Sequence, residues 1–502
     1  MSVCRARSLS LFGIDALPVE VEVDVSPGLP GFSIVGLPDA AVQEARERVR
    51  VAISNSGYKF PMKRVIVNLA PANLRKEGPA FDLPIALGIL AASGALAPAG
   101  LERAAVVGEL SLDGGVRGIK GALSMAEGAR KEGLSRLVLP CRDAPEAAVI
   151  GGVEVFGMRT LKEAVEFLGN GLRRAPTEPA PQNETDDSAA DDFADVAGQR
   201  YAKRALEVAA AGAHNVVMSG PPGSGKTMLA RRMPGILPPL TMEERIEVTK
   251  VHSASGEGNG SLITHRPFRS PHHTVSTSGL AGGGSNPRPG EVSLAHNGVL
   301  FLDELPEFGR TTLEALRQPL EDGHVTISRV AATLCYPARI TLLCSMNPCP
   351  CGHAGDKRKA CRCTAGQIER YQARISGPLL DRMDIFVDVP RLSRQELRDE
   401  PSAEASAVVR DRVRKARATQ ISRQGSPNSM LSGRKLRKMC VLAGDAETLF
   451  SRAVETLGLS GRGHDRVLRV ARTVADLAGE RGIGADHLAE ALNYRRSHLL
   501  GR

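Results

Sequence analysis

Aromatic residues are scarce in this sequence, and their scarcity limits how its cores can be built. The 502 residues include no tryptophan, 5 tyrosines and 12 phenylalanines, so aromatics make up 3% of the chain. Aliphatic side chains must therefore fill most of the interior, although a hydrophobic content of 42% and a charged content of 24% are ordinary for globular protein. A chain of this length is expected to form about three domains.

Long apolar segments are missing as well. No window approaches the ~18 consecutive apolar residues of a membrane-spanning helix. Acidic residues at positions 15, 20, 22 and 24 interrupt the N-terminal stretch where a secretory signal needs its apolar core. Four of the nine cysteines crowd into residues 349–363 and the others are scattered, which is not a disulfide framework and suits a reducing compartment. We therefore expect a cytoplasmic protein with no membrane association.

The positive charge is concentrated at one end of the chain. The net charge is +9, and residues 391–502 hold 22 Lys and Arg against 13 Asp and Glu, so this segment alone carries the whole excess. A basic segment of this kind predicts a polyanionic partner such as nucleic acid. Solvated basic helices are the alternative interpretation.

A glycine-rich phosphate-binding motif is the strongest signal in the chain. Its residues are Gly220, Pro221, Pro222, Gly223, Ser224, Gly225, Lys226 and Thr227, which match G-x-x-x-x-G-K-[ST] at every fixed position. The apolar run before it predicts a strand and the residues after it predict a helix, so backbone N–H groups would face the phosphates. Lys226 would reach the β- and γ-phosphates and Thr227 would bind Mg²⁺. The sequence therefore predicts binding of ATP with Mg²⁺.

Two adjacent carboxylates follow a second apolar run. Residues 299–302 predict a strand, and Asp303 and Glu304 come directly after it. The end of such a strand lies beside the phosphate-binding loop, where Asp303 can hold Mg²⁺ through water. Glu304 is then placed to orient or deprotonate the attacking water. We predict that both carboxylates are catalytic.

Two further segments resemble the ring-forming ATPases of the AAA+ class. A predicted core strand ends at Asn347, which matches an asparagine that contacts the γ-phosphate or the water in that class. Residues 377–384 resemble the helix end that presents an arginine finger to the neighbouring subunit, and Arg382 is the matching residue. Its planar, permanently charged head suits a transition-state phosphate. A local salt bridge with Asp381 and Asp384 is the alternative.

Two insertions distinguish this nucleotide domain from a minimal one. Residues 255–297 are rich in glycine and polar side chains and are expected to form a long irregular loop. Residues 324–338 predict a hairpin with its tip near Arg329 and Val330. In the related helicase and chelatase branches of AAA+, hairpins in these two places line the central pore. Arg329 would then reach phosphates, and a solvated turn residue is the alternative.

Four cysteines form a C-x-C, nine-residue gap, C-x-C pattern. They are Cys349, Cys351, Cys361 and Cys363. Four thiolates suit tetrahedral Zn²⁺, although C-x-C is a tighter spacing than the C-x₂₋₄-C of most zinc sites. A reduced, redox-sensitive loop is the alternative to a zinc site.

Residues 1–173 are predicted to form a separate α+β domain. Strict alternation over residues 19–25 predicts a half-buried strand. Residues 76–83 resemble the segment that carries the nucleophilic serine of Lon-type proteases, but the matching position is Ala80, which has no hydroxyl. Lys120 falls near the catalytic lysine of that family and has no nucleophile to activate. We expect a Lon-protease-like fold without peptidase activity.

The rest of the chain divides into a linker and two further parts. Residues 174–195 are acidic and proline-containing, and we expect a linker that lets the first domain move. Residues 196–390 form the predicted AAA+ domain, and 391–502 a basic helical lid. AAA+ lids carry an arginine that faces the γ-phosphate. Arg462, at the start of a predicted helix, is preferred for this role, and Arg469, seven residues on, is the alternative.

Nearly the whole chain resembles the ComM (YifB) family of magnesium-chelatase-like AAA+ ATPases. The residues that carry the resemblance are Gly36–Asp39, Val67–Pro71, Gly220–Thr227, Arg266–His273, Gly284–Glu291, Phe301–Leu305 and Asn347–Gly352. The resemblance implies an α/β fold, with a P-loop AAA+ domain and helical C-terminal lid preceded by an α+β Lon-protease-like domain.

The same resemblance implies a function. It indicates a homo-hexameric motor that binds single-stranded or branched DNA and migrates its branches in DNA recombination and natural transformation, with other recombination proteins as partners. ATP would sit between subunits, with Arg382 supplied by the next protomer. An ATP-driven protein remodeller like the magnesium chelatase ATPase subunit is the competing hypothesis. An ATP-dependent protease is a third, and Ala80 argues against it.

Overall fold

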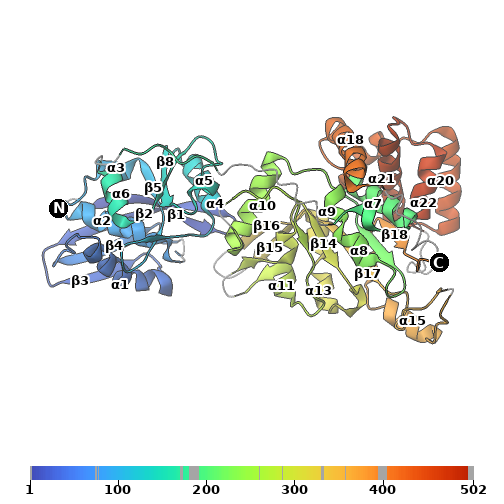
Figure 1. The fold of residues 1–502 in the computed structure, drawn as a ribbon, viewed down its shortest axis with the longest axis horizontal. Coiled ribbons are helices and arrows are strands. Elements are labelled where there is room, and N and C mark those ends of the chain that lie inside the picture. The colour runs from blue at the N-terminus through green and yellow to red at the C-terminus, as the bar shows by residue number, and fades with distance from the viewer. Residues whose placement is uncertain are drawn as a thin grey trace. The chain divides into compact units, whose positions relative to one another are not determined.

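The computed structural model divides the chain into two units. One comprises residues 1–183 and 242–263, and the other comprises residues 184–241 and 264–502 (Figure 1). The described residues are 3–73, 76, 78–169, 173–179, 191–258, 261–284, 287–328, 333–356, 358–393 and 404–495. The tip of the predicted hairpin at residues 329–332 and half of the predicted linker, residues 180–190, lie outside them.

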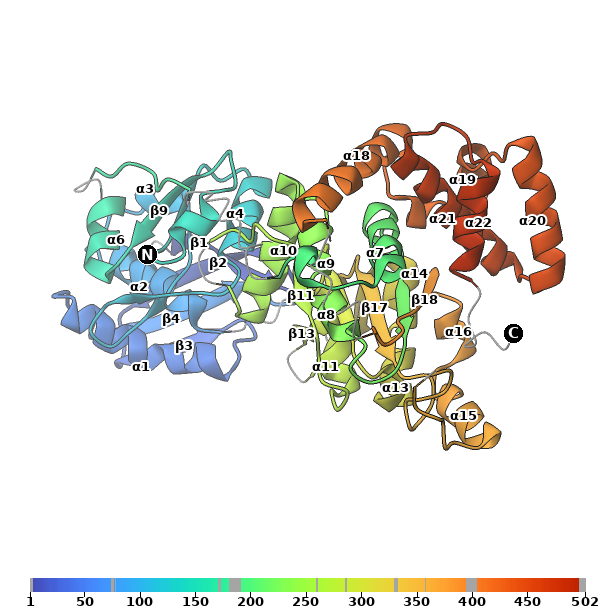
Figure 2. The ribbon, with the colours of Figure 1, turned by 45° about the vertical axis from the view of Figure 1, so that its right-hand side comes forward.

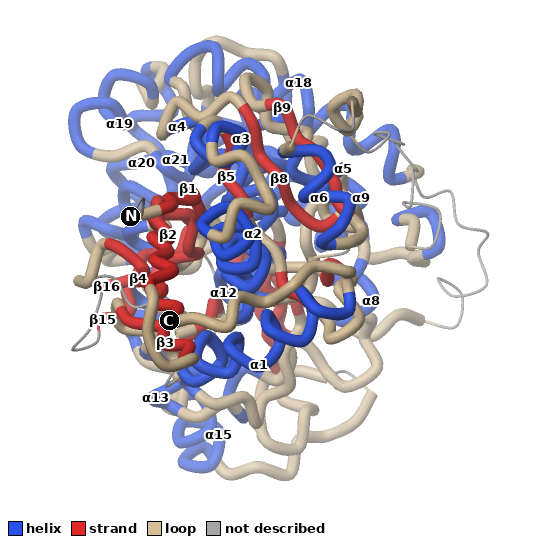
Figure 3. The backbone as a smooth tube through the Cα atoms, turned by 90° about the vertical axis from the view of Figure 1, so that its left-hand side faces the viewer, coloured by secondary structure: helices blue, strands red, loops and turns tan. Residues whose placement is uncertain are grey.

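A seven-stranded mixed sheet forms the centre of the first unit. Its strand order is β3-β4-β2-β1-β5-β8-β9, with β8 and β9 on the far side of β1 from β4 and β3 (Figure 3). The strands are β1 (Cys4–Phe12), β2 (Asp15–Ser26), β3 (Gly31–Val35), β4 (Arg64–Ala70), β5 (Ala104–Val106), β8 (Arg136–Pro140) and β9 (Glu154–Met158). In β2 the valines at 19, 21 and 23 are buried and their neighbours are not, which confirms the predicted alternation.

Helices pack on the sheet of the first unit. They are α1 (Ala40–Asn55), α2 (Asp82–Ala92), α3 (Ala99–Glu102), α4 (Ala122–Lys131), α5 (Ala144–Ala147), α6 (Leu161–Leu168) and α10 (Met242–Ser255). One apolar core joins the sheet to α1, α2 and α6, and a second joins it to α4 and α5. Strand β5 ends at Val106, and a separate two-residue β6 (Glu109–Leu110) pairs with β7 (Val116–Arg117).

Helix α10 belongs to the first unit although it lies within the sequence of the predicted nucleotide domain. Its Lys250 is buried, with Nζ 2.9 Å from Oδ1 of Asp15 and 2.7 Å from Oε2 of Glu127. Burial opposes the charge, but the hydrogen bonds to both carboxylates raise the pKa of Lys250 above its ordinary value. The N–H of Gly121 also donates to Oγ of Ser253 at 3.1 Å.

A five-stranded parallel sheet forms the centre of the second unit. Its order is β11-β14-β17-β10-β18, with β11 (Phe268–Arg269), β14 (Val299–Leu302), β17 (Thr341–Met346), β10 (Val216–Ser219) and β18 (Ile385–Asp388). β10, β14, β17 and β18 are almost wholly buried, and apolar residues dominate each of them. Val216 and Met218 enter one core and Val217 the other, so apolar layers cover both faces.

Short helices and two hairpins surround the five-stranded sheet of this unit. The helices are α7 (Arg200–Gly212), α8 (Lys226–Arg231), α9 (Met233–Ile236), α11 (Thr277–Ala281), α12 (Glu291–Leu294), α13 (Arg310–Glu314), α14 (Arg317–Asp322), α15 (Ala365–Gln372) and α16 (Gly377–Leu380). The hairpins are β12–β13 (Gly282–Gly283, Arg288–Pro289) and β15–β16 (His324–Ser328, Thr333–Pro337). The second confirms the predicted hairpin. The first lies in the insertion over 255–297, which was expected to form a long irregular loop and which holds a hairpin in the related helicase and chelatase branches of AAA+.

The C-terminal part of the second unit is helical. It consists of α18 (Ser406–Gln424), α19 (Gly433–Met439), α20 (Gly444–Leu457), α21 (Gly461–Ala478) and α22 (Ala485–Asn493) (Figure 2). These helices share one apolar core with α7, β10 and β18. None of the helices within the described residues has the length and apolarity needed to cross a bilayer.

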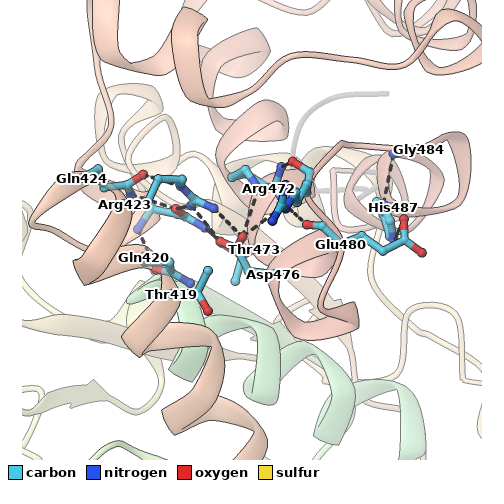
Figure 4. A network of polar contacts seen from close by, with 12 residues as sticks. Thr419, Gln420, Arg423, Gln424, Arg472, Thr473, Asp476, Glu480, Gly484 and His487 are labelled. Atoms are coloured by element: carbon cyan, nitrogen blue, oxygen red, sulfur yellow. Dashed lines mark hydrogen bonds and ion pairs between the residues drawn. The ribbon is translucent and has the colours of Figure 1, made fainter.

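A buried ionic network joins these C-terminal helices (Figure 4). Asp476 on α21 accepts hydrogen bonds from Arg423 at 2.6 and 2.9 Å and from Arg472 at 3.2 Å. Nδ2 of Asn428 donates to the same carboxylate at 2.8 Å. Burial lowers the pKa of Arg472, and the charge of Asp476 opposes that effect. Part of the basic excess of this segment therefore serves the internal structure.

We predict that Asp476→Ala weakens the C-terminal helices. The substitution leaves buried Arg472 and half-buried Arg423 without their counter-charge, and breaking a buried ion pair costs about 3–5 kcal/mol. Amide hydrogen exchange of α18 and α21 in the full chain measures the loss. Asp486→Ala, at an exposed position on α22, is the matched control. Equal protection in the two variants would contradict the prediction.

Candidate nucleotide site

The phosphate-binding motif connects β10 to α8, as the sequence predicts. Gly223 and Gly225 have φ values of 73° and 93°, a region that favours glycine. At Gly220 a Cβ atom would lie 2.1 Å from the carbonyl oxygen of Val389, so only glycine fits there. The loop therefore leaves the buried strand, turns tightly and presents the N-terminus of α8, which is the arrangement that binds phosphate.

Lys226 is held inside the loop. Its Nζ donates to the carbonyl oxygens of Gly220 at 2.7 Å and Pro221 at 3.0 Å. Burial lowers the pKa of Lys226, and the carboxylates of Asp303 and Glu304 oppose this effect. The cation therefore lies in a cradle of carbonyl oxygens.

Asp303 connects three segments at the carboxyl edge of the sheet. Its Oδ2 accepts from the hydroxyl of Thr227 at 2.9 Å, and its Oδ1 accepts from the hydroxyl of Ser345 and from the N–H of Glu304, the latter at 3.1 Å. β14 and β17 pair in parallel, with Leu302 opposite Cys344, so both strands end at this edge. A hydroxyl beside a carboxylate is a ligand set that Mg²⁺ accepts.

Glu304 follows in a left-handed backbone conformation, with φ 54° and ψ 48°. This conformation is uncommon for a residue other than glycine, and such strain clusters at functional sites. Its side chain is 58% exposed, and its Oε2 lies 3.8 Å from Nδ1 of His273. The rings of His272 and His273 are 4.1 Å apart. His273 was predicted only to lie in the insertion over 255–297. Its contact with Glu304 could not be predicted, because it depends on how the insertion folds.

Asn347 comes one residue after β17 and faces the loop. Its Oδ1 is 3.4 Å from Nζ of Lys226. The predicted residues Lys226, Thr227, Asp303 and Asn347 are thus joined by direct contacts, with Glu304 adjacent in the chain.

Two residues at this site were not predicted. Ser345 binds Asp303, and Nε2 of Gln199 donates to the carbonyl oxygens of Ser224 at 3.1 Å and Pro390 at 2.7 Å. The amide of Gln199 therefore supports the phosphate-binding loop. Ser345 could have been found from the sequence, because it lies at the end of the predicted core strand that precedes Asn347.

Arg382 lies two residues after α16 and is buried. Its Nη1 donates to the carbonyl oxygen of Pro378 at 2.7 Å, and its Nη2 forms an ion pair with Glu321. Asp384, one member of the alternative salt bridge, is instead 3.6 Å from both Nδ1 of His214 and Nη1 of Arg466. The role of Arg382 as a finger stays a prediction.

The two lid candidates lie on α21. Arg462 is exposed in the first turn, and Arg469 is half-buried with its Nε enclosed and unpaired. The described residues show neither one bonded to the phosphate-binding loop. Arg466, between them, was not predicted and contacts Asp384. The choice of sensor arginine therefore also stays a prediction.

The four predicted zinc ligands come together next to Asn347. Their Sγ atoms all lie within 4.8 Å of one another, and three of the separations are 3.4, 3.6 and 3.6 Å. A tetrahedron with Zn–S bonds of about 2.3 Å has S–S edges of about 3.8 Å, and a disulfide would be about 2.05 Å. N–H groups of Arg362 and His353 lower the pKa of the Cys351 thiol to about 6. The donor set fits Zn²⁺.

Four cations of the predicted basic segment are exposed on one short helix. They are Arg434, Lys435, Arg437 and Lys438 of α19. By contrast, Arg412 and Arg417 of α18 contact Glu207 and the carbonyl oxygens at the end of α7. Only part of the basic excess is therefore available to a partner.

Three family models match consecutive parts of the chain. The model "Subunit ChlI of Mg-chelatase" matches residues 21–143, "Magnesium chelatase, subunit ChlI" matches 192–397, and "Magnesium chelatase, subunit ChlI C-terminal" matches 403–495. The magnesium-chelatase 38 kDa subunit of Rhodobacter capsulatus is 23% identical over 62% of this chain and 88% of its own length.

Two other relatives match along nearly their whole length. The competence protein ComM of Haemophilus influenzae is 45% identical over 501 residues, covering 99% of this chain and 98% of the relative. The YifB protein of Salmonella typhimurium is 45% identical over 497 residues, covering 99% and 97%. With this identity over both units and all three family models in order, the chain belongs to the ComM (YifB) family of magnesium-chelatase-like proteins.

Proposed function

We propose that this chain is an ATPase that works as a homo-hexameric DNA motor and migrates branched DNA. The observation that carries the ATPase part is the contact of Lys226 with Asn347 and of Thr227 with Asp303. These contacts bring a phosphate-binding cation, a magnesium ligand set and a water-orienting amide to one edge of a parallel sheet. The magnesium-chelatase-like AAA+ family suggests the same cofactors, ATP and Mg²⁺.

Each of these groups would have a separate role in ATP hydrolysis. Nζ of Lys226 would exchange its carbonyl partners for phosphate oxygens, which are stronger acceptors. Thr227 and Asp303 would hold Mg²⁺ directly and through water. Glu304 would take the proton of the attacking water while Asn347 orients it. His273, 3.8 Å from Glu304, would hold that carboxylate in place.

The hexameric part of the proposal rests on Arg382. A finger acts on the triphosphate of the adjacent protomer, so Arg382 would leave Glu321 when protomers assemble. An exposed glutamate is a replaceable partner for this arginine, because the side chain of Glu321 is 53% exposed. The sensor arginine of the lid, Arg462 or Arg469, would complete the site.

The DNA part rests on exposed positive charge and on the family. Helix α19 offers four exposed cations, which suit the phosphates of single-stranded or branched DNA. The hairpins β12–β13 and β15–β16 would line the pore of a ring. Because a relative bears the name competence protein ComM, the proposed setting is recombination during natural transformation, with other recombination proteins as further partners.

An ATP-driven protein remodeller is the second candidate. The match of the family models and of the Rhodobacter capsulatus magnesium-chelatase subunit favours it. That relative covers 62% of this chain, whereas the ComM relative covers 99%. Hydrolysis stimulated by forked DNA supports the motor, and porphyrin-dependent metal insertion supports the remodeller.

Two further parts of the proposal concern the remaining elements. We extend the cofactor set to one structural Zn²⁺ held by the four clustered cysteines. We assign the first unit an inherited Lon-protease-like fold without peptidase activity, because residue 80 is alanine. Both assignments leave the ATPase chemistry unchanged.

We predict that Glu304→Gln lowers ATP hydrolysis by about 10²–10⁴-fold while ATP binding persists, because the amide cannot accept the proton of water. Steady-state turnover and binding of a fluorescent ATP analogue measure the two effects. Glu307→Gln, an exposed carboxylate ion-paired to Arg374, is the control and should retain turnover. The motor proposal fails if forked DNA does not change the ATPase rate of the wild-type protein and no branched substrate is remodelled.

We predict that Arg382→Ala and Lys226→Ala each lower turnover by about 10³-fold, and that a mixture of the two regains activity. In mixed rings, an intact phosphate-binding loop from one variant meets an intact Arg382 from the other. Titration of one variant against the other measures this recovery. A purely structural role for Arg382 would leave every mixture inactive.

We predict that Lys435→Gln/Lys438→Gln weakens DNA binding at all sequences and lowers the salt slope by about 1 for each phosphate that the variant no longer neutralises. Affinity for forked DNA across a salt series measures the effect. Lys59→Gln/Lys63→Gln, which removes two exposed lysines from the first unit, is the control. Equal salt slopes in the two variants would remove α19 from the DNA-binding surface.

A further inference from the structure

The cysteine cluster is attached directly to the nucleotide site. Only Pro348 separates Asn347 from Cys349, and Cys349 is fully buried. Nε2 of Gln372, on α15, donates to the carbonyl oxygen of Pro348 at 3.3 Å. Cys349 is therefore connected through one anchored residue to Asn347, the residue that contacts Lys226.

The turn between the cysteine pairs also packs against the phosphate-binding loop. Gly352 is buried, with φ 81°. A Cβ atom at this position would lie 2.6 Å from Cδ and 2.8 Å from Cγ of Pro222. The backbone of Gly352 therefore lies directly on the ring of Pro222. Nη2 of Arg391 donates to the carbonyl oxygen of Pro222 at 3.1 Å, so this part of the loop is supported at two points.

Hydrogen bonds to the cysteines stabilise the turn that contains Gly352. The N–H of Gly352 donates to the carbonyl oxygen of Cys349 at 2.9 Å, and the N–H of Ala354 donates to Sγ of Cys349 at 3.3 Å. The N–H of Cys363 donates to Sγ of Cys361 at 3.4 Å. Backbone N–H groups on ligand sulfurs are the outer-shell contacts that orient metal ligands. A bound metal would therefore fix Gly352 where it meets Pro222.

We propose that Zn²⁺ bound by Cys349, Cys351, Cys361 and Cys363 braces the phosphate-binding loop through the Gly352–Pro222 contact, so that Zn²⁺ and nucleotide bind cooperatively. The metal confines the turn before nucleotide arrives, and the loop then gives up less conformational freedom when it closes on phosphate. This inference rests on the ATP and Zn²⁺ sites proposed above and requires neither DNA nor a ring.

Cooperativity between two ligands is reciprocal, so one coupling factor governs both. We expect about one Zn²⁺ per purified chain by mass spectrometry of the metal. A non-hydrolysable ATP analogue at saturation should slow Zn²⁺ transfer to a colorimetric chelator by roughly tenfold. Protein stripped of Zn²⁺ should bind the analogue roughly tenfold more weakly, and added Zn²⁺ should restore the affinity.

A pair of glycine variants separates the brace from general damage to the loop. Gly352→Ala and Gly355→Ala both place alanine at positive φ, 81° and 76°, in the same loop. Only the alanine at 352 would collide with Pro222, because a Cβ at 355 meets nothing within 4 Å. We expect both variants to retain Zn²⁺, and Gly352→Ala alone to bind the analogue about tenfold more weakly, a cost within the range of overpacking. Pro222→Ala in the Gly352→Ala background should recover part of that affinity.

Three results would overturn the inference. If freshly purified protein contains no Zn²⁺ and also fails to take it up, the proposed metal site does not exist. If saturating analogue does not slow Zn²⁺ release, the metal and nucleotide sites are not coupled, although the metal site itself still stands. If Gly352→Ala and Gly355→Ala bind the analogue with equal affinity, the Gly352–Pro222 contact does not support the phosphate-binding loop. All measurements use the full chain without DNA, so failure of the motor proposal in the forked-DNA assay leaves these results unchanged.

Discussion

The carboxylate of Asp303 is the interaction on which the nucleotide site depends. It accepts hydrogen bonds from Thr227 at the start of α8, from Ser345 at the end of β17 and from the N–H of Glu304 after β14. A charge at the edge of a buried sheet is stable only with such donors. Three segments far apart in the sequence are therefore held in register, and each functional loop leaves the sheet from this edge.

The same edge carries a second layer of support. Lys226 contacts Asn347, and two residues later the chain enters the cysteine cluster, whose turn lies on Pro222. The end of β17, the turn between the cysteine pairs and the phosphate-binding loop are thus linked to one another by short contacts. Preorganisation of this kind reduces the conformational freedom given up on binding. The phosphate-binding loop is therefore supported in part by residues outside the motif, such as Gly352 and the clustered cysteines.

The sequence predicted elements whose signals are local. The motif around Lys226 and the alternation in β2 depend on neighbouring residues, and both are confirmed. Strand β1 (Cys4–Phe12) was not predicted, because its alternation is short and mixes serine with leucine. Ser345 and Gln199 were missed because their partners are fixed by strand register and chain path. Arg382 meets Glu321, 61 residues away, a pairing that no local pattern contains.

Helix α10 makes the two units inseparable as a matter of topology. The chain leaves the second unit after residue 241, forms this helix within the first unit, and returns after residue 263. Excision of residues 1–183 would remove both carboxylate partners of Lys250, Asp15 and Glu127, and leave α10 without the rest of the unit on which it packs. A deletion that removed the whole first unit would therefore have to remove two separate segments of the sequence, residues 1–183 and 242–263.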